Sequence, residues 1–233
     1  LVGANYGTID RSWSDMTLQL TDTTSIAGGL VGFNAGTIDE SYALRAIRYA
    51  NTGPNLSGFV GINTGTITNS YSTLTYDDPL FVSATKSTWL SAFAYKNSGT
   101  IADSYATSYS FDTATHAGFV YDNTGGTTTN DYWYAGYATT ASTYGDNSTA
   151  TLLTAAQAAN FGSYAGFSSD VWAESSSGYA VLKNTVVYVV SGSTTEYGSD
   201  LALVGLGLQG GGGAFSLVRG YTANGAILAL FVF

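Results

Sequence analysis

Residues 30–42 read LVGFNAGTIDESY, and this pattern recurs along the first half of the chain. Similar letters stand at residues 1–13 (LVGANYGTIDRSW), 59–71 (FVGINTGTITNSY) and 93–105 (FAYKNSGTIADSY), and a worn fifth copy begins at 119–125 (FVYDNTG). Successive copies of the asparagine are 29, 29, 34 and 26 residues apart. A constant motif with variable spacing indicates fixed strands and turns, joined by loops that absorb the differences.

Each copy has a physical interpretation. The apolar pair before the asparagine predicts a short, inward-facing strand. Asn-x-Gly predicts a turn, since both residues tolerate left-handed backbone angles. Thr-Ile begins a second strand and Ser-Tyr continues it, so period two places the aromatic ring on the same face as the isoleucine. A third strand follows, for example at residues 17–20 or 72–76, and three strands per copy are typical of a three-sided parallel β-helix.

Stacked copies place like residues above like, and only a stack can bury the face of one coil. We therefore expect an isoleucine ladder, an aromatic ladder and an asparagine amide ladder between coils. The predicted fold is all-β: a right-handed parallel β-helix (β-solenoid) of about five coils, followed by a capping segment with a short helix and a further β-rich region. The repeat positions expected to build the stack are Asn5, Gly7, Ile9, Trp13, Asn34, Gly36, Ile38, Tyr42, Asn63, Gly65, Ile67, Tyr71, Asn97, Gly99, Ile101 and Tyr105.

The Gly-Thr-Ile/Ser-Tyr pattern resembles the GLUG repeat of large bacterial surface proteins, including filamentous-haemagglutinin-like adhesins of the two-partner-secretion type. The resemblance covers roughly the first half of the chain and holds over four copies. It implies a secreted or cell-surface solenoid that builds length and presents loops, and it transfers no catalytic residue.

The pattern changes after the fourth copy. In the fifth copy Thr127 stands for the isoleucine and Tyr132 arrives one residue late. Residues 152–159 are helix-like, with Thr151 or Thr154 as the cap. Residues 164–182 resemble the closing segment that follows GLUG arrays, although Ala180 stands where a proline is usual, and we expect this segment to cover the last coil. The predicted domains are the solenoid (1–135), a linker and cap (136–184) and a strand-rich region (185–233), which is either a further small β-domain or more solenoid.

Composition excludes several classes of function. The 233 residues carry a formal net charge of −9 with only 7 Lys plus Arg, which disfavours binding to nucleic acid or to anionic lipid. The absence of cysteine excludes disulfides and thiolate metal sites. No apolar run reaches the roughly 18 residues of a membrane helix. Because residue 1 falls inside a repeat, we expect the chain to be a fragment of a longer protein.

Each candidate site in the sequence also has a purely structural explanation. The single histidine, His116, has no sequence partner for zinc or catalysis, and residues 205–210 match a dinucleotide fingerprint without the helix that should follow it. Residues 132–134 and Tyr137 could stack on sugars, but packing is favoured. Paired carboxylates could cleave polysaccharide or bind calcium. Several of them, however, occupy the same position in successive repeats, which favours a role in solvating a turn. The acids of residues 77–79 lie in an inserted loop and are the best candidates for a functional role. The recurring carboxylates are Asp10, Asp39, Glu40, Asp77, Asp78, Asp103, Asp112 and Asp131.

Three functions remain open on the sequence alone. The favoured one is a non-catalytic structural or adhesive stalk of a bacterial adhesin, for attachment to cells or matrix. A subunit of a stiff extracellular filament and a β-helix polysaccharide-active enzyme are the alternatives. We expect no catalytic, cofactor or metal residue. The expected partners are the rest of a longer chain, neighbouring copies through the solenoid ends, and host or matrix glycans.

Overall fold

The structure is a computed structural model. It describes residues 2–15, 18–20, 26–44, 47–49, 55–75, 89–109, 116–135, 148–183, 201–202, 218–222 and 227–230. The chain separates into two compact units, Leu1–Leu182 and Lys183–Phe233. Residues 76–88, 184–190 and 203–217 lie outside the described residues, so the expectations for the acidic loop, the strand at 186–190 and the glycine-rich stretch at 205–210 stay predictions.

The first unit consists of short strands in a repeating order. The first two repeats form β1 (Val2–Asn5), β2 (Thr8–Asp10), β3 (Trp13–Asp15), β4 (Leu18–Leu20), β5 (Ile26–Gly28), β6 (Val31–Asn34), β7 (Thr37–Asp39), β8 (Tyr42–Leu44) and β9 (Ile47–Tyr49). The next two form β10 (Asn55–Ser57), β11 (Val60–Asn63), β12 (Thr66–Thr68), β13 (Tyr71–Thr75), β14 (Trp89–Ser91), β15 (Ala94–Asn97), β16 (Thr100–Ala102) and β17 (Tyr105–Tyr109). The worn copy forms β18 (His116–Ala117), β19 (Val120–Asp122), β20 (Thr127–Thr129) and β21 (Tyr132–Ala135).

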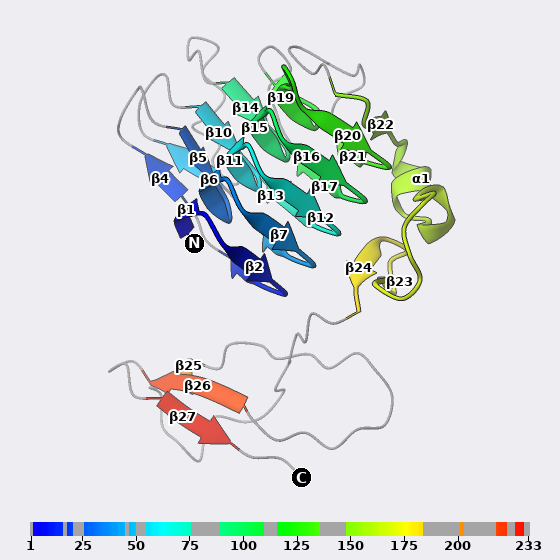
Figure 1. Ribbon diagram of the computed structural model, residues 1–233. Helices are drawn as coiled ribbons and strands as arrows, with labels where there is room; N and C mark the ends of the chain where they lie inside the picture. Colours follow the sequence, from blue (N-terminus) through cyan, green and yellow to red (C-terminus); the bar gives the residue numbers. More distant parts are fainter. Residues whose placement is uncertain are drawn as a thin grey trace. The chain divides into compact units, whose positions relative to one another are not determined.

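Equivalent strands stack side by side into parallel sheets, which confirms the predicted β-solenoid (Figure 1). The order β1-β6-β11-β15-β19 forms one five-stranded sheet and β2-β7-β12-β16-β20 forms another. The register pairs Asn5 with Asn34 and Ile9 with Ile38. In these two sheets the strands of the second, third and fourth repeats have a neighbour on both sides, and the strands of the first and fifth repeats form the edges.

The predicted three strands per repeat are wrong, because every turn contributes at least four strands and the strands of the turns form five parallel sheets. The third sheet contains β21-β17-β13-β8-β3, and the strand predicted at residues 17–20 is present as β4, which pairs with β9 in a two-stranded sheet. The additional sheet has the order β18-β14-β10-β5 and precedes the apolar pair of each copy. The Thr-Ile and Ser-Tyr segments, expected to be one strand, are separate strands in different sheets. Between them the chain turns at a residue with positive φ, such as Glu40 at 43°. That left-handed residue bends the backbone and ends the first strand.

The corner also moves the aromatic residue away from the isoleucine face. Ile38, Ile67 and Ile101 are fully buried in an inner cluster with Phe59 and Phe93, among others. The tyrosines after the corner belong to a different cluster, formed with the segment that follows the solenoid. The expectation that isoleucine and tyrosine share one face is therefore wrong, since a period-two argument holds only within one continuous strand.

Crowding between turns requires glycine at Gly36, Gly65 and Gly99, whereas a Cβ atom at Gly7 of the first turn would meet no other atom within 4 Å. The described glycines with positive φ are Gly125, Gly166 and Gly178. The left-handed role predicted for the repeat glycine is therefore wrong for Gly7, Gly36, Gly65 and Gly99 and holds only for Gly125 of the fifth copy. A Cβ atom at Gly65 would lie 2.1 Å from the carbonyl oxygen of Gly36 in the preceding turn. Only glycine allows the two backbones to approach so closely.

The fifth repeat contains one additional residue in its turn. Thr128, and not Thr127, pairs with Ile101, while Tyr132 pairs with Tyr105. The additional residue is accommodated at Gly125, where φ is 80°. Trp133 fills the inner cluster of this turn, and its indole ring occupies the space that a side chain at Gly118 would need.

The closing segment, residues 148–182, continues from the last turn. It contains β22 (Thr151–Leu152), which pairs in parallel with β21, and α1 (Ala155–Ala158), whose N-cap is Thr154. A 3₁₀ turn at Phe161–Ser163 and an antiparallel pair, β23 (Trp172–Glu174) and β24 (Ala180–Leu182), follow. Figure 1 shows α1, β23 and β24 beside the stack of strands.

The closing segment covers a lateral face in addition to the last coil. Trp172 is fully buried, and its ring lies 6.1 Å from that of Tyr71 and 5.8 Å from that of Tyr105. Tyr105 Oη donates a hydrogen bond of 2.7 Å to the carbonyl of Ala180. The expectation of a cap over the last coil alone is therefore corrected, because the tyrosines left outside the solenoid present an apolar face that must be buried.

The second unit is described at three strands. β25 (Leu201–Ala202), β26 (Val218–Thr222) and β27 (Ile227–Leu230) form an antiparallel sheet in that order. This pairing differs from the parallel stacking of the solenoid.

Candidate functional site

The polar corner lies between the sheet β2-β7-β12-β16-β20 and the sheet that contains β3 and β8. It brings together five of the acids singled out in the sequence, namely Asp10, Asp39, Glu40, Asp103 and Asp131. Each turn places a left-handed residue here, followed by a serine or, in the fifth turn, an aspartate. The left-handed residues are Arg11, Glu40, Asn69, Asp103 and Asn130. The residues after them are Ser12, Ser41, Ser70, Ser104 and Asp131.

The serines link the turns through a hydrogen-bonded column. Ser41 Oγ donates to the carbonyl of Asp39 at 2.7 Å and accepts from the backbone N–H of Ser12 at 3.1 Å. Ser70 and Ser104 repeat both bonds. The column satisfies backbone donors at a corner where the strand ladder is interrupted.

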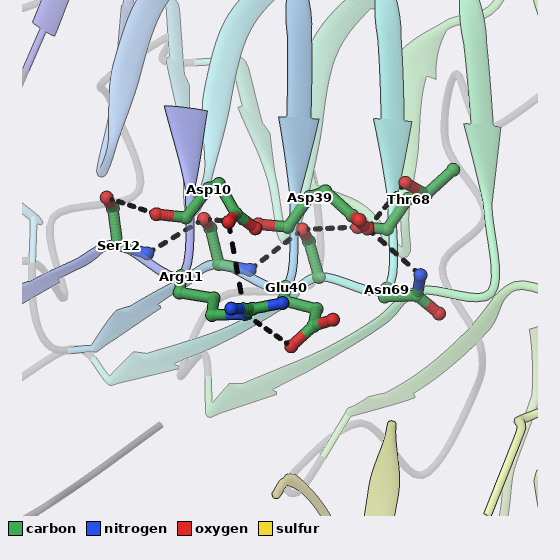
Figure 2. Close-up of polar contacts among 9 residues, drawn as sticks. Asp10, Arg11, Ser12, Asp39, Glu40, Thr68 and Asn69 are labelled. Carbon is green, nitrogen blue, oxygen red and sulfur yellow. Dashed lines mark hydrogen bonds and ion pairs between the residues drawn. The ribbon is translucent and has the colours of Figure 1, made fainter. Parts of the chain in front are cut away.

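The carboxylates of Asp39 and Glu40 at the corner accept hydrogen bonds from side chains of neighbouring turns, as Figure 2 shows for the first three turns. Glu40 accepts from Arg11 Nε at 3.2 Å. Asp39 Oδ1 accepts from Thr68 Oγ1 at 2.7 Å and from Asn69 Nδ2 at 2.9 Å. The hydrogen bond to Glu40 is also the main cause that raises the pKa of Arg11.

The sequence assigns these acids to solvation of a turn, and the structure places oxygens of Asp39 and Glu40 in hydrogen bonds with side chains of neighbouring turns. Asp103 follows the same rule, because its Oδ1 accepts from Asn130 Nδ2 at 2.9 Å. A general acid–base pair or a calcium site needs carboxylate oxygens directed at a substrate or an ion. Within the described ranges, no group of three or more His, Cys, Asp or Glu residues could hold a metal ion.

Asp131 is the exception among these acids. It is 2% exposed, its Oδ1 accepts from the backbone N–H of Ser104 at 2.9 Å, and its Oδ2 accepts from that of Thr129 at 3.0 Å. Burial is the main cause that raises the pKa of Asp131 to about 8, against the opposite effect of the two N–H groups. Asp103 raises it further through like charge.

The turn asparagines form the amide ladder expected from the sequence. The Nδ2 atom of each donates to Oδ1 of the next, from Asn5 to Asn34 at 2.8 Å, Asn34 to Asn63 at 2.7 Å, Asn63 to Asn97 at 2.8 Å and Asn97 to Asn123 at 2.7 Å. The three middle asparagines are at most 1% exposed. Each buried amide therefore has partners in both adjacent turns, which is what a buried polar group requires.

The aromatic column consists of Trp13, Tyr42, Tyr71, Tyr105 and Tyr132, which pair in register along one sheet. The rings of Tyr42 and Tyr71 are 4.9 Å apart with an interplanar angle of 3°, and those of Tyr71 and Tyr105 are 5.1 Å apart with an angle of 6°. The four tyrosines belong to one buried cluster with the closing segment, whereas Trp13 of the first turn is 49% exposed. The tyrosine rings consequently serve packing.

Other candidates are placed as follows. His116 lies in β18, and its side chain is outside the described residues, as are Asp77, Asp78, Asp112 and Tyr137. Tyr132 and Trp133 are buried at 7% and 4% exposure, so they are not a sugar-stacking platform on the surface.

Two features were missed by the sequence argument. The serine column was visible as a constant residue before the aromatic one, and the hydroxyl bonds between turns follow from that constancy. A second ladder of rings, Phe59, Phe93 and Phe119, stacks at 4.7 Å in the inner cluster. Its signal was the recurrence of a large apolar residue four positions before each asparagine.

Comparison of the chain with models of known protein families, with curated proteins and with solved structures found no match. In the part of the chain that the structure describes, no helix has the length and apolar character to cross a membrane.

Proposed function

We propose that the chain is a non-catalytic structural or adhesive stalk of a secreted or cell-surface bacterial adhesin, in which the solenoid supplies reach and the loops supply contact. The observation that supports this most is the use of the repeat positions. Asparagine, glycine, isoleucine and serine of successive copies all contact their own counterparts in the next turn. The polar and apolar groups of the motif are therefore used in contacts between stacked turns.

Geometry explains how such a stack serves as a stalk. Each turn adds about 4.8 Å to the axis, the spacing between neighbouring strands. Repeats therefore set the length, whereas the loops differ in length from copy to copy without disturbing the register. Weak contacts made by many loops or many copies multiply into firm attachment.

The GLUG resemblance supports the location and the bacterial source in this proposal. Host or matrix glycans, and the remaining parts of a longer chain, are the partners that it implies. A filament subunit and a polysaccharide-active enzyme are the competing functions, with Asp77 and Asp78 as the acids to test for the enzyme.

An attachment assay tests the proposal. Microspheres carrying the chain at graded densities are offered to epithelial cells, bacterial cells, matrix proteins and a glycan array. Matched spheres carry Ile67→Asp, which places a charge in the inner cluster and should abolish the solenoid. We expect attachment that rises more steeply than the density of the native chain and that is lost with the variant.

The competing functions predict different results. Equal attachment by native and Ile67→Asp spheres at every density would refute the adhesive role. End-to-end fibres in electron micrographs of the native full-length protein would favour the filament. Release of reducing ends from polysaccharides, abolished by Asp77→Asn or Asp78→Asn, would favour the enzyme.

A further inference from the structure

The fifth turn replaces the serine of the polar corner by a carboxyl group. In the second, third and fourth turns the serine hydroxyl is neutral, donates to a carbonyl and accepts an N–H. Asp131 accepts from Ser104 N of the preceding turn and from Thr129 N of its own turn. An ionisable group thus stands in a buried column whose other members cannot change their charge.

The neighbours of Asp131 hold the closing segment. Tyr132 Oη donates to the carbonyl of Ala165 at 2.8 Å. Asn130 lies so close to Gly166 that a Cβ atom there would be 2.5 Å from Asn130 Nδ2. The carbonyl of Asp131 itself accepts from the N–H of Thr151 in β22 at 2.8 Å.

Burial of the Asp131 carboxyl favours its neutral form, whereas the two backbone N–H groups that donate to it favour the ionised form, and burial has the larger effect. Asp103 contributes like charge, and β21, which begins directly after Asp131, carries the ionisable residues Tyr132 and Tyr134. β20 and β22 carry no ionisable side chain. On the other packed elements the ionisable groups are Tyr105 and Tyr164, whose pKa values burial raises, so their hydroxyls stay protonated near neutral pH.

We propose that Asp131 is a pH-sensitive latch: while protonated it holds the fifth turn and the closing segment together, and its ionisation loosens the closing segment from the aromatic column. The thermodynamic sign follows from the direction of the shift. Folding raises the pKa of this carboxyl, so an open form ionises at lower pH than the closed form. The closed form is therefore fully favoured in acid, loses stability as the pH rises from about 4 to about 8, and loses no more above that.

Hydrogen exchange of the complete chain, followed by mass spectrometry between pH 5 and 9, tests the latch. Peptides from residues 155–182 report on the closing segment, and their rates are corrected for the intrinsic effect of pH on exchange. We expect the opening constant to rise by up to about tenfold per pH unit below pH 8 and to level off above it.

Variants isolate the carboxyl. Asp131→Ser restores the residue of the other four turns and should make the corrected opening constant independent of pH, and Asp131→Asn should do the same if the first variant folds poorly. Asp103→Asn removes the like charge and should move the transition to lower pH. The control Asp170→Asn changes an exposed acid of the closing segment and should leave the wild-type profile intact.

Two results would overturn the latch. One is a hydrogen-exchange opening constant for residues 155–182 of the native chain that is the same at pH 5 and pH 9 after correction for the intrinsic effect of pH. The other is an unchanged pH response in both Asp131→Ser and Asp131→Asn, because the titrating group would then lie elsewhere.

Discussion

The substitution Asn63→Ala tests whether the amide ladder stabilises the solenoid. Asn63 is fully buried, donates to Asn97 Oδ1 at 2.8 Å and accepts from Asn34 Nδ2 at 2.7 Å. Alanine removes both hydrogen bonds, each of which contributes about 1 kcal/mol to the net stability. The side-chain amides of Asn34 and Asn97 then each have one partner fewer. The amides keep weaker contacts, since Asn97 Oδ1 still accepts from Gly99 N at 3.2 Å. We therefore expect a loss of about 2 to 3 kcal/mol of unfolding free energy.

Urea denaturation followed by circular dichroism and tyrosine fluorescence measures that loss. The matched control is Thr66→Ala, an exposed position on the neighbouring strand of the same turn, which should change stability by less than about 0.5 kcal/mol. Asn63→Asp keeps the shape but cannot donate to Asn97 when ionised. Burial raises the pKa of the introduced carboxyl, so this variant should be most stable in acid and should weaken as the pH rises above about 4. Asn63→Ala and Thr66→Ala with equal midpoints would refute the reasoning.

Three further substitutions probe other parts of the stack. Ile67→Ala should cost about 3 kcal/mol in urea denaturation, because the isoleucine is fully buried; a cost below about 1 kcal/mol would contradict the position assigned to the inner cluster. Gly65→Ala should cost at least about 2 kcal/mol, since its Cβ would meet the carbonyl oxygen of Gly36, and an alanine variant as stable as the native chain would show that the turns can separate without penalty. Tyr105→Phe should cost about 1 to 2 kcal/mol and raise hydrogen exchange in residues 164–182, because the carbonyl of Ala180 loses its donor; unchanged exchange there would argue against this contact.

The repeat made the solenoid predictable because every stacked position recurs in the sequence at the same phase. The number of sheets and the position of the polar corner were not predictable in the same way. The polar corner depends on one left-handed residue in each turn, and these residues are of four kinds: Arg11, Glu40, Asp103 and the asparagines Asn69 and Asn130. No common side chain marks them. The role of the repeat glycine was also hidden, since a glycine required by a neighbouring backbone and a glycine required by positive φ look alike in a sequence.

The closing segment shows a second limit. Its Phe167 and Trp172 indicated an apolar surface to be covered, and the sequence placed that surface at the end of the stack. The tyrosines that they cover, Tyr71 and Tyr105, precede Trp172 by many residues and belong to different turns. The spacing of residues along the sequence does not predict such a contact. The contact depends on the side of the polar corner from which each tyrosine ring extends.

That lateral contact changes how the solenoid comes apart. A stack in which each turn contacts only its neighbours can fray from an end, one turn at a time. The closing segment leaves the fifth turn through β22 and reaches back to the third and fourth turns through Trp172. Removing the last turn therefore also breaks contacts made two turns earlier, so these turns unravel as one cooperative block while the first turns remain free to open singly.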